Sequence, residues 1–147
     1  MDCSRFSSTS KGSGLSLTKN GKRVDVVAGN WNNIRGDQPL LDGNVYSFTV
    51  EMSEGTNTAI GVIEEGQFQS EGGIFARGHV YFNHGYASGC LQGYLFKPTL
   101  SGFNVVIDLV NYTISIGSNS RNLPRPSAGN YYLVGILYFI GQFIEIH

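Results

Sequence analysis

The segment Val45-Tyr-Ser-Phe-Thr-Val-Glu-Met52 places apolar side chains at intervals near two, a spacing that predicts a β-strand with one buried face. A second segment, Phe103-Asn-Val-Val-Ile-Asp-Leu-Val-Asn-Tyr-Thr-Ile-Ser-Ile-Gly117, repeats this spacing on both sides of residues 109–111 and predicts a hairpin. Neither segment carries a catalytic signature. Together they indicate an all-β protein.

The same spacing and turn signals extend the prediction along the chain. Asn20-Gly21 predicts a hairpin turn, and residues 131–146 predict two buried strands that turn at Gly141-Gln142. Polar connections are predicted over residues 29–42 and 64–73, and over 121–130, where two prolines argue against a central strand. The predicted strands are residues 14–19, 22–27, 44–52, 58–64, 78–83, 92–96, 103–109, 112–117, 131–139 and 142–146.

Length and composition indicate one domain. A chain of 147 residues with 41% hydrophobic content fills a single core, and its twenty glycines suit a protein with many tight turns. We expect a flexible N-terminal segment over residues 1–11 and one domain over residues 12–147.

Charge and cysteine content argue against several classes of function. The net charge is -1 and the basic residues are scattered, so no footprint for nucleic acid is evident. The two cysteines, Cys3 and Cys90, are too few for a disulfide framework and wrongly spaced for zinc. With no signal-peptide pattern and no apolar run long enough for membrane insertion, we expect a cytoplasmic or nuclear protein without cofactor or metal.

Several motifs occur in the order found in the SPRY family, also called B30.2-like. The first half has Leu15-Ser-Leu-Thr-Lys-Asn-Gly-Lys-Arg-Val24, Trp31 before Gly36-Asp-Gln-Pro-Leu40, and Gly43-Asn-Val-Tyr-Ser-Phe-Thr-Val50. In the second half, Gln92-Gly-Tyr-Leu95 and Gly102-Phe-Asn-Val-Val-Ile-Asp108 follow in register. The chain therefore resembles a divergent SPRY domain over roughly residues 12–146, although Ile116-Gly-Ser-Asn-Ser120 departs from the family's hairpin ending.

The resemblance implies a bent, concanavalin-like sandwich of two antiparallel sheets. It further implies a non-catalytic module that binds a peptide or protein partner through loops at one rim. The loops expected to form this surface are residues 30–37, 67–77, 83–88 and 121–126. Aromatic and arginine side chains suit such contacts, because they offer large rigid area or planar donor forks. The candidate partner-binding residues are Trp31, Arg35, Arg77, Asn83, Tyr86 and Arg121.

Other interpretations stay open at this stage. Trp31 is equally consistent with a packed tryptophan of the sandwich. The glutamates at 54, 64, 65 and 71 lie in polar sequence and do not predict a glycosidase pair, and His79 and His84 lack further metal ligands at suitable spacing. An architectural subunit of a larger assembly is the second functional hypothesis. A lectin-like protein is the third, with Asp37 and Asp42 as its closest acidic pair.

Overall fold

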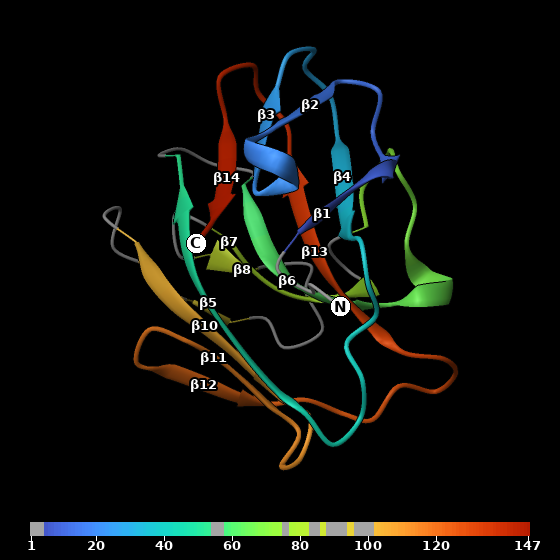
Figure 1. Ribbon diagram of the computed structural model, residues 1–147, viewed down its shortest axis with the longest axis vertical. Helices are drawn as coiled ribbons and strands as arrows, with labels where there is room; N and C mark the ends of the chain where they lie inside the picture. Colours follow the sequence, from blue (N-terminus) through green and yellow to red (C-terminus); the bar gives the residue numbers. More distant parts are fainter. Residues whose placement is uncertain (1–4, 54–57, 75–76, 83–85, 88–93, 96–101) are drawn as a thin grey trace.

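Two antiparallel sheets packed face to face make up the computed structural model, which describes residues 5–53, 58–74, 77–82, 86–87, 94–95 and 102–147 (Figure 1). One sheet has the strand order β1-β4-β13-β6-β7, and the other has the order β12-β11-β10-β5-β14-β3-β2. The predicted all-β, two-sheet sandwich is confirmed. Within the described part of the chain, no helix has the length and hydropathy of a membrane-spanning segment.

The strands follow one another along the chain with two short 3-10 turns between them. Strands β8 and β9 form a separate two-stranded ribbon. In chain order the elements are β1 (Phe6–Lys11), β2 (Leu15–Thr18), η1 (Lys19–Gly21), β3 (Arg23–Val26), β4 (Asn32–Gly36), β5 (Val45–Met52), β6 (Ala59–Glu64), η2 (Glu65–Gln67), β7 (His79–Phe82), β8 (Tyr86–Ala87), β9 (Tyr94–Leu95), β10 (Phe103–Asp108), β11 (Thr113–Ile116), β12 (Asn119–Asn122), β13 (Tyr131–Leu137) and β14 (Phe143–Ile146).

Both predicted hairpins form, but the second turn spans residues 109–112 rather than the predicted 109–111, because Tyr112 adopts a left-handed φ of 54° outside β11. Strands β2 and β3 pair from Leu15↔Val26 to Thr18↔Arg23 around Asn20 and Gly21, which adopt the left-handed φ values of 55° and 82°. Strands β10 and β11 pair from Val105↔Ile116 to Asp108↔Thr113. The alternating patterns of β5 and β10 are explained by their pairing with each other, which places Phe48, Val50 and Val105 in the core.

Strand β13 is buried at all seven positions because it is covered on both faces. Leu133 and Leu137 belong to the main core between the sheets. Val134 and Ile136 belong to a second apolar cluster, on the outer face of the five-stranded sheet. We call the connection over residues 65–74 the covering connection, because its Ile74 and Phe68 pack against this second cluster.

Four strands, β1, β4, β8 and β12, lie wholly or partly where the sequence predicts loops or a flexible segment. The predicted flexible segment 1–11 is wrong for Phe6–Lys11, because Phe6 is buried and β1 pairs with β4. The register of β1 shifts between its two ends, and the Ser7 side chain accepts the N–H groups of Thr9 (3.2 Å) and Ser10 (2.9 Å). These bonds provide partners for main-chain groups where the register of β1 shifts.

Two of the predicted binding loops, residues 30–37 and 121–126, contain strand residues, which belong to β4 and β12. Residues 32–36 form β4, because Ile34 is fully buried and Asn32 and Asn33 hydrogen-bond to loops on either side. Residues 119–122 form β12, an edge strand that pairs with β11. The ribbon strand Tyr86–Ala87 likewise replaces part of the predicted loop 83–88, whose other residues lie outside the described chain.

The last two strands belong to different sheets. Strand β13 lies between β4 and β6, whereas β14 lies between β5 and β3. The predicted turn at Gly141-Gln142 is present, with φ 94° at Gly141, and it carries the chain from one sheet to the other.

A ladder of charged side chains crosses the outer face of the seven-stranded sheet. Glu145, only 5% exposed, accepts Lys19 Nζ at 3.0 Å and Arg23 Nη1 at 3.1 Å, and Arg23 also pairs with Asp25 at 3.0 Å. The hydrogen bond from Lys19 lowers the pKa of Glu145, Arg23 adds to this, and burial opposes it. Ionised Glu145 therefore links β14 to β3 and to the η1 turn.

Acid should weaken this ladder. Because the folded-state pKa of Glu145 lies below its unfolded value of about 4.3, its contribution is present above that value and is lost as pH falls through the folded-state pKa. We expect Glu145→Gln to lower the free energy of unfolding by about 1–2 kcal/mol at pH 7. The difference from the wild type should shrink toward pH 3 in urea titrations, whereas an unchanging difference would contradict this role of the carboxylate.

Candidate binding surface

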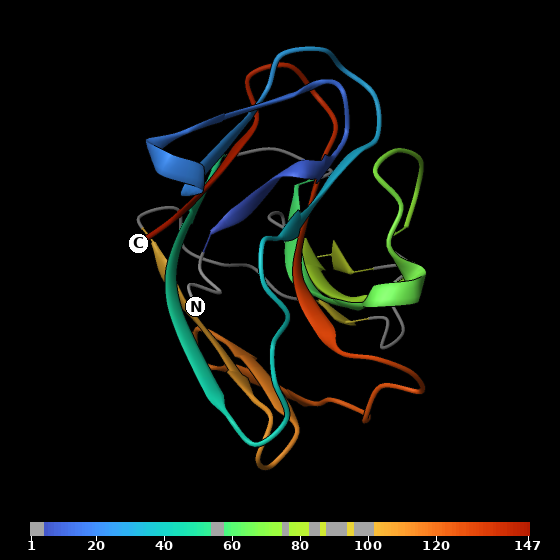
Figure 2. The same ribbon diagram turned by 45° about the vertical axis from the view of Figure 1, so that its right-hand side comes forward.

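Exposed apolar side chains gather on two loops at one end of the sandwich. The loops over residues 27–31 and 138–142 lie side by side in both views (Figures 1 and 2). The exposed fractions are 59% for Val27, 50% for Phe139 and 71% for Ile140. With the half-buried rings of Trp31 and Tyr138, these residues form a surface that we call the end patch.

The rings of the end patch contact one another edge to face. The Trp31 and Tyr138 centroids are 4.9 Å apart at 79°, and those of Tyr138 and Phe139 are 4.8 Å apart at 65°. Trp31 also packs against the second apolar cluster. It is therefore both a packed and a partly exposed tryptophan, and it anchors the patch on the outer face of the five-stranded sheet.

Gln142 fixes the loop that carries Phe139 and Ile140. Its side chain is 5% exposed, and its Oε1 accepts the N–H groups of Tyr138 and Phe139 at 2.9 Å each. Main-chain bonds join this loop to its neighbour, because Asn30 N–H donates to the Tyr138 carbonyl at 3.1 Å and Gly141 N–H to the Val26 carbonyl at 3.2 Å. The two loops thus form one hydrogen-bonded unit.

The side chain of Asn32 fixes the loop over residues 27–31. Its Nδ2 donates to the carbonyls of Ala28 and Asn30 at 3.0 Å each, and its Oδ1 accepts Gly14 N–H at 3.1 Å. The residue is 2% exposed. A buried amide with these contacts is costly to disturb, so these hydrogen bonds restrain the loop.

The predicted site residues separate into two groups. Trp31 and Arg35 lie at alternate positions of one strand path and share the outer face of the five-stranded sheet. Exposed Arg77 follows the covering connection, where its N–H donates to the Ile74 carbonyl at 2.9 Å. Arg121 lies apart from them on β12, at the edge of the other sheet.

Two predicted residues cannot be assigned to the end patch. Tyr86 is in the β8 ribbon, and Asn83 lies outside the described residues. The sequence analysis also missed Phe139 and Ile140, because the largely apolar residues 131–139 predict a buried strand up to the turn at Gly141-Gln142. The available signal was the turn at Gly141-Gln142, since residues next to a turn reach the surface.

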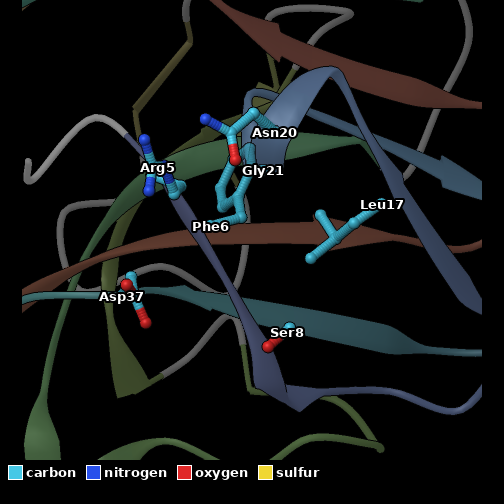
Figure 3. Close-up of a pocket in the computed structure, with 7 residues that line it drawn as sticks. All are labelled: Arg5, Phe6, Ser8, Leu17, Asn20, Gly21 and Asp37. Atoms are coloured by element: carbon cyan, nitrogen blue, oxygen red, sulfur yellow. The ribbon is translucent and has the colours of Figure 1, made fainter.

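A cavity of about 310 Å³ opens between β1 and the η1 turn (Figure 3). It lies beside the edges of the two sheets. Its lining includes Arg5, Asp37 and Asn20 together with the apolar Phe6 and Leu17. Neither a nucleophile with its base nor a carboxylate pair lines this cavity, and none of the end-patch residues borders it.

Two of the glutamates considered for catalysis, Glu64 and Glu71, hold loops in place through hydrogen bonds. Burial raises the pKa of Glu64, but hydrogen bonds from Ser127 and Ala128 outweigh it and the net shift is downward. A hydrogen bond from Ser13 lowers the pKa of Glu71. A general acid needs a raised pKa, so these groups do not fit that role. Among the described residues, no three His, Cys, Asp or Glu side chains gather as a metal site.

Neither the models of protein families nor the curated proteins give a match to the sequence. Solved structures do match the fold. The TRIM65 PSpry domain aligns with a TM-score of 0.67 at 12% identity, over 97% of this chain and 88% of that domain. Stonustoxin aligns with a TM-score of 0.69 at 12% identity, over 97% of this chain, which spans 26% of the toxin chain. The protein therefore has a SPRY-like fold.

Removing the Gln142 acceptor should loosen the end patch. We expect Gln142→Ala to speed amide hydrogen exchange at Tyr138 and Phe139 roughly fivefold, because each amide loses a hydrogen bond worth about 1 kcal/mol. Gln67→Ala, at an exposed glutamine of η2, is the matched control and should leave both rates unchanged. Equal rates in the wild type and Gln142→Ala would show that the loop is ordered by other contacts.

Proposed function

We propose that this chain is a non-catalytic protein-binding module, a cytoplasmic or nuclear adaptor that receives a segment of a partner protein on its end patch. The observation that carries the proposal is the concentration of Val27, Phe139 and Ile140 on two loops held by buried amides. The likeness to a PSpry domain supports the proposal at the level of the fold.

Two properties of the end patch favour binding: its exposed apolar area and the fixed conformation of its loops. Apolar side chains grouped on a surface gain free energy when a partner removes them from water. Because the loops are already fixed, binding loses little conformational entropy at this surface. Trp31 adds a large ring at the border of the patch, a residue type enriched among side chains that dominate interface energies.

Charge placed on the end patch should abolish binding. We would select displayed random peptides on the immobilised wild type and measure the affinity of the best sequences by fluorescence anisotropy. The double variant Phe139→Asp, Ile140→Asp should weaken them at least thirtyfold, corresponding to a loss of about 2 kcal/mol. Both side chains are at least half exposed, so the fold should persist.

Val110→Asp is the matched control, because Val110 is 56% exposed and belongs to the turn between β10 and β11, which lies at the opposite end of the sandwich (Figure 1). Selected peptides should bind this variant as they bind the wild type. If the peptides bind the double variant with unchanged affinity, or if no peptide is enriched on the wild type, the end patch is not the binding surface.

The opposite end favours the architectural hypothesis as a second candidate. Val45 and Val110 (56% exposed each) and Leu41 (37%) lie there, and Gly43 N–H donates to the Leu109 carbonyl at 2.9 Å, joining the two turns. Apolar surface at both ends suits a subunit held between two neighbours. In that case Val110→Asp would release a native assembly partner that Phe139→Asp, Ile140→Asp retains.

A further inference from the structure

Three arginines in the described chain stack on aromatic rings. The guanidinium carbon of Arg23 lies 4.0 Å from the Phe143 centroid, that of Arg125 lies 4.2 Å from Tyr112, and that of Arg35 lies 4.0 Å from Tyr132. Stacking holds the plane of a guanidinium without using its N–H donors. The three sites therefore share the same stacked geometry. They differ in whether a carboxylate of the chain accepts hydrogen bonds from the guanidinium.

Two of these arginines already bind carboxylates of the chain. Arg23 forms bonds of 3.0 Å to each oxygen of Asp25 and a third to Glu145, and Arg125 pairs with Asp42 at 3.3 Å. Arg35 forms no ion pair with any described residue, and its enclosed Nε has no hydrogen-bond partner there. Arg35 is thus stacked like Arg23 and Arg125, but no carboxylate among the described residues pairs with it.

The surroundings of Arg35 hold it ready for binding. Its strand, β4, is paired on both sides, with β1 and β13. Tyr132 beneath it is fixed by a hydrogen bond from its hydroxyl to Glu65 Oε1 at 3.1 Å, and the Phe68 ring lies 6.0 Å from the guanidinium carbon. The half-buried side chain therefore has little rotamer freedom to lose when a carboxylate binds.

We propose that Arg35 binds an aspartate or glutamate side chain of the protein partner whose apolar residue contacts the end patch. This inference rests on the proposed function and specifies the partner's chemistry. Arg35 and Trp31 are four residues apart on one face, a separation of about 13 Å. The covering connection lies between them, because buried Asn33 bonds to the carbonyls of Gln69 and Gly72, so a partner segment that reaches both side chains passes over this connection and needs at least five residues. The partner segment therefore combines an apolar anchor with an acidic residue at least four positions away.

A carboxylate fits this site better than a phosphate. Glu65 bonds to the same tyrosine that Arg35 stacks on, so a dianion would meet a neighbouring negative charge with one guanidinium to compensate it. A singly charged carboxylate matches the planar fork of one arginine in a bidentate pair. The net charge of -1 for the whole chain adds no further attraction for a polyanion.

The test uses the intact chain and the displayed random peptide library. Peptides selected on the wild type should contain an acidic residue, and peptides selected on Arg35→Glu should carry lysine or arginine in its place. A synthetic wild-type-selected peptide should lose at least tenfold in affinity when its acidic residue is replaced by the matching amide. Arg35→Gln should bind the acidic and amide peptides with nearly equal affinity.

Arg125→Glu is the control, since Arg125 is also stacked but is paired with Asp42 at the opposite end. It should select the same acidic peptides as the wild type. If selected peptides require Phe139 and Ile140 but lose no affinity in their amide form, the Arg35 inference is wrong and the proposed function stands. If no peptide is enriched on the wild type, both are wrong. The comparison of the two peptides on one protein is independent of how well any variant folds.

Discussion

The burial of β13 on both of its faces is the constraint on which the rest of the structure depends. A strand in the interior of a sheet with no solvent face needs cover from two directions. The seven-stranded sheet supplies one cover, through contacts with Leu133 and Leu137. The covering connection supplies the other, because Phe68 and Ile74 pack over Val134 and Ile136. Trp31 and Arg35 lie at the borders of this second cover, so the candidate surface is a consequence of how β13 is buried.

Buried amides connect that architecture to the exposed loops. Asn33 is fully buried and its Nδ2 donates to the carbonyls of Gln69 and Gly72, which holds the covering connection against β4. Asn32 and Gln142 do the same for the two loops of the end patch. Each amide replaces water for main-chain groups that a loop would otherwise expose. The order of the end patch and the stability of the sandwich thus depend on the same side chains.

Sequence patterns predicted the strands whose buried side chains are apolar and missed the strands whose buried side chains include polar ones. Strands β5, β10, β11 and β13 carry regular apolar spacing, and all were predicted. Strand β4 reads Asn-Asn-Ile-Arg-Gly, and its two asparagines are buried only because loops distant in sequence meet them. Strand β1 is rich in serine and has a shifted register. Residue type alone led to the prediction of Trp31 and Arg35 as candidates. The exposure of Phe139 and Ile140 depends on a turn between two sheets, which periodicity within the run did not reveal.

The strand order has a consequence for how the protein is made. The central partners β13 and β14 come after every other strand of their sheets in the chain, so β2 and β3 remain separate from β5 until β14 inserts between them. During translation the earlier hairpins emerge with apolar faces and strand edges still uncovered. The five-stranded sheet is complete only when β13 is available, and the seven-stranded sheet only when β14 is available, so the sandwich closes around pairings between strands distant in sequence.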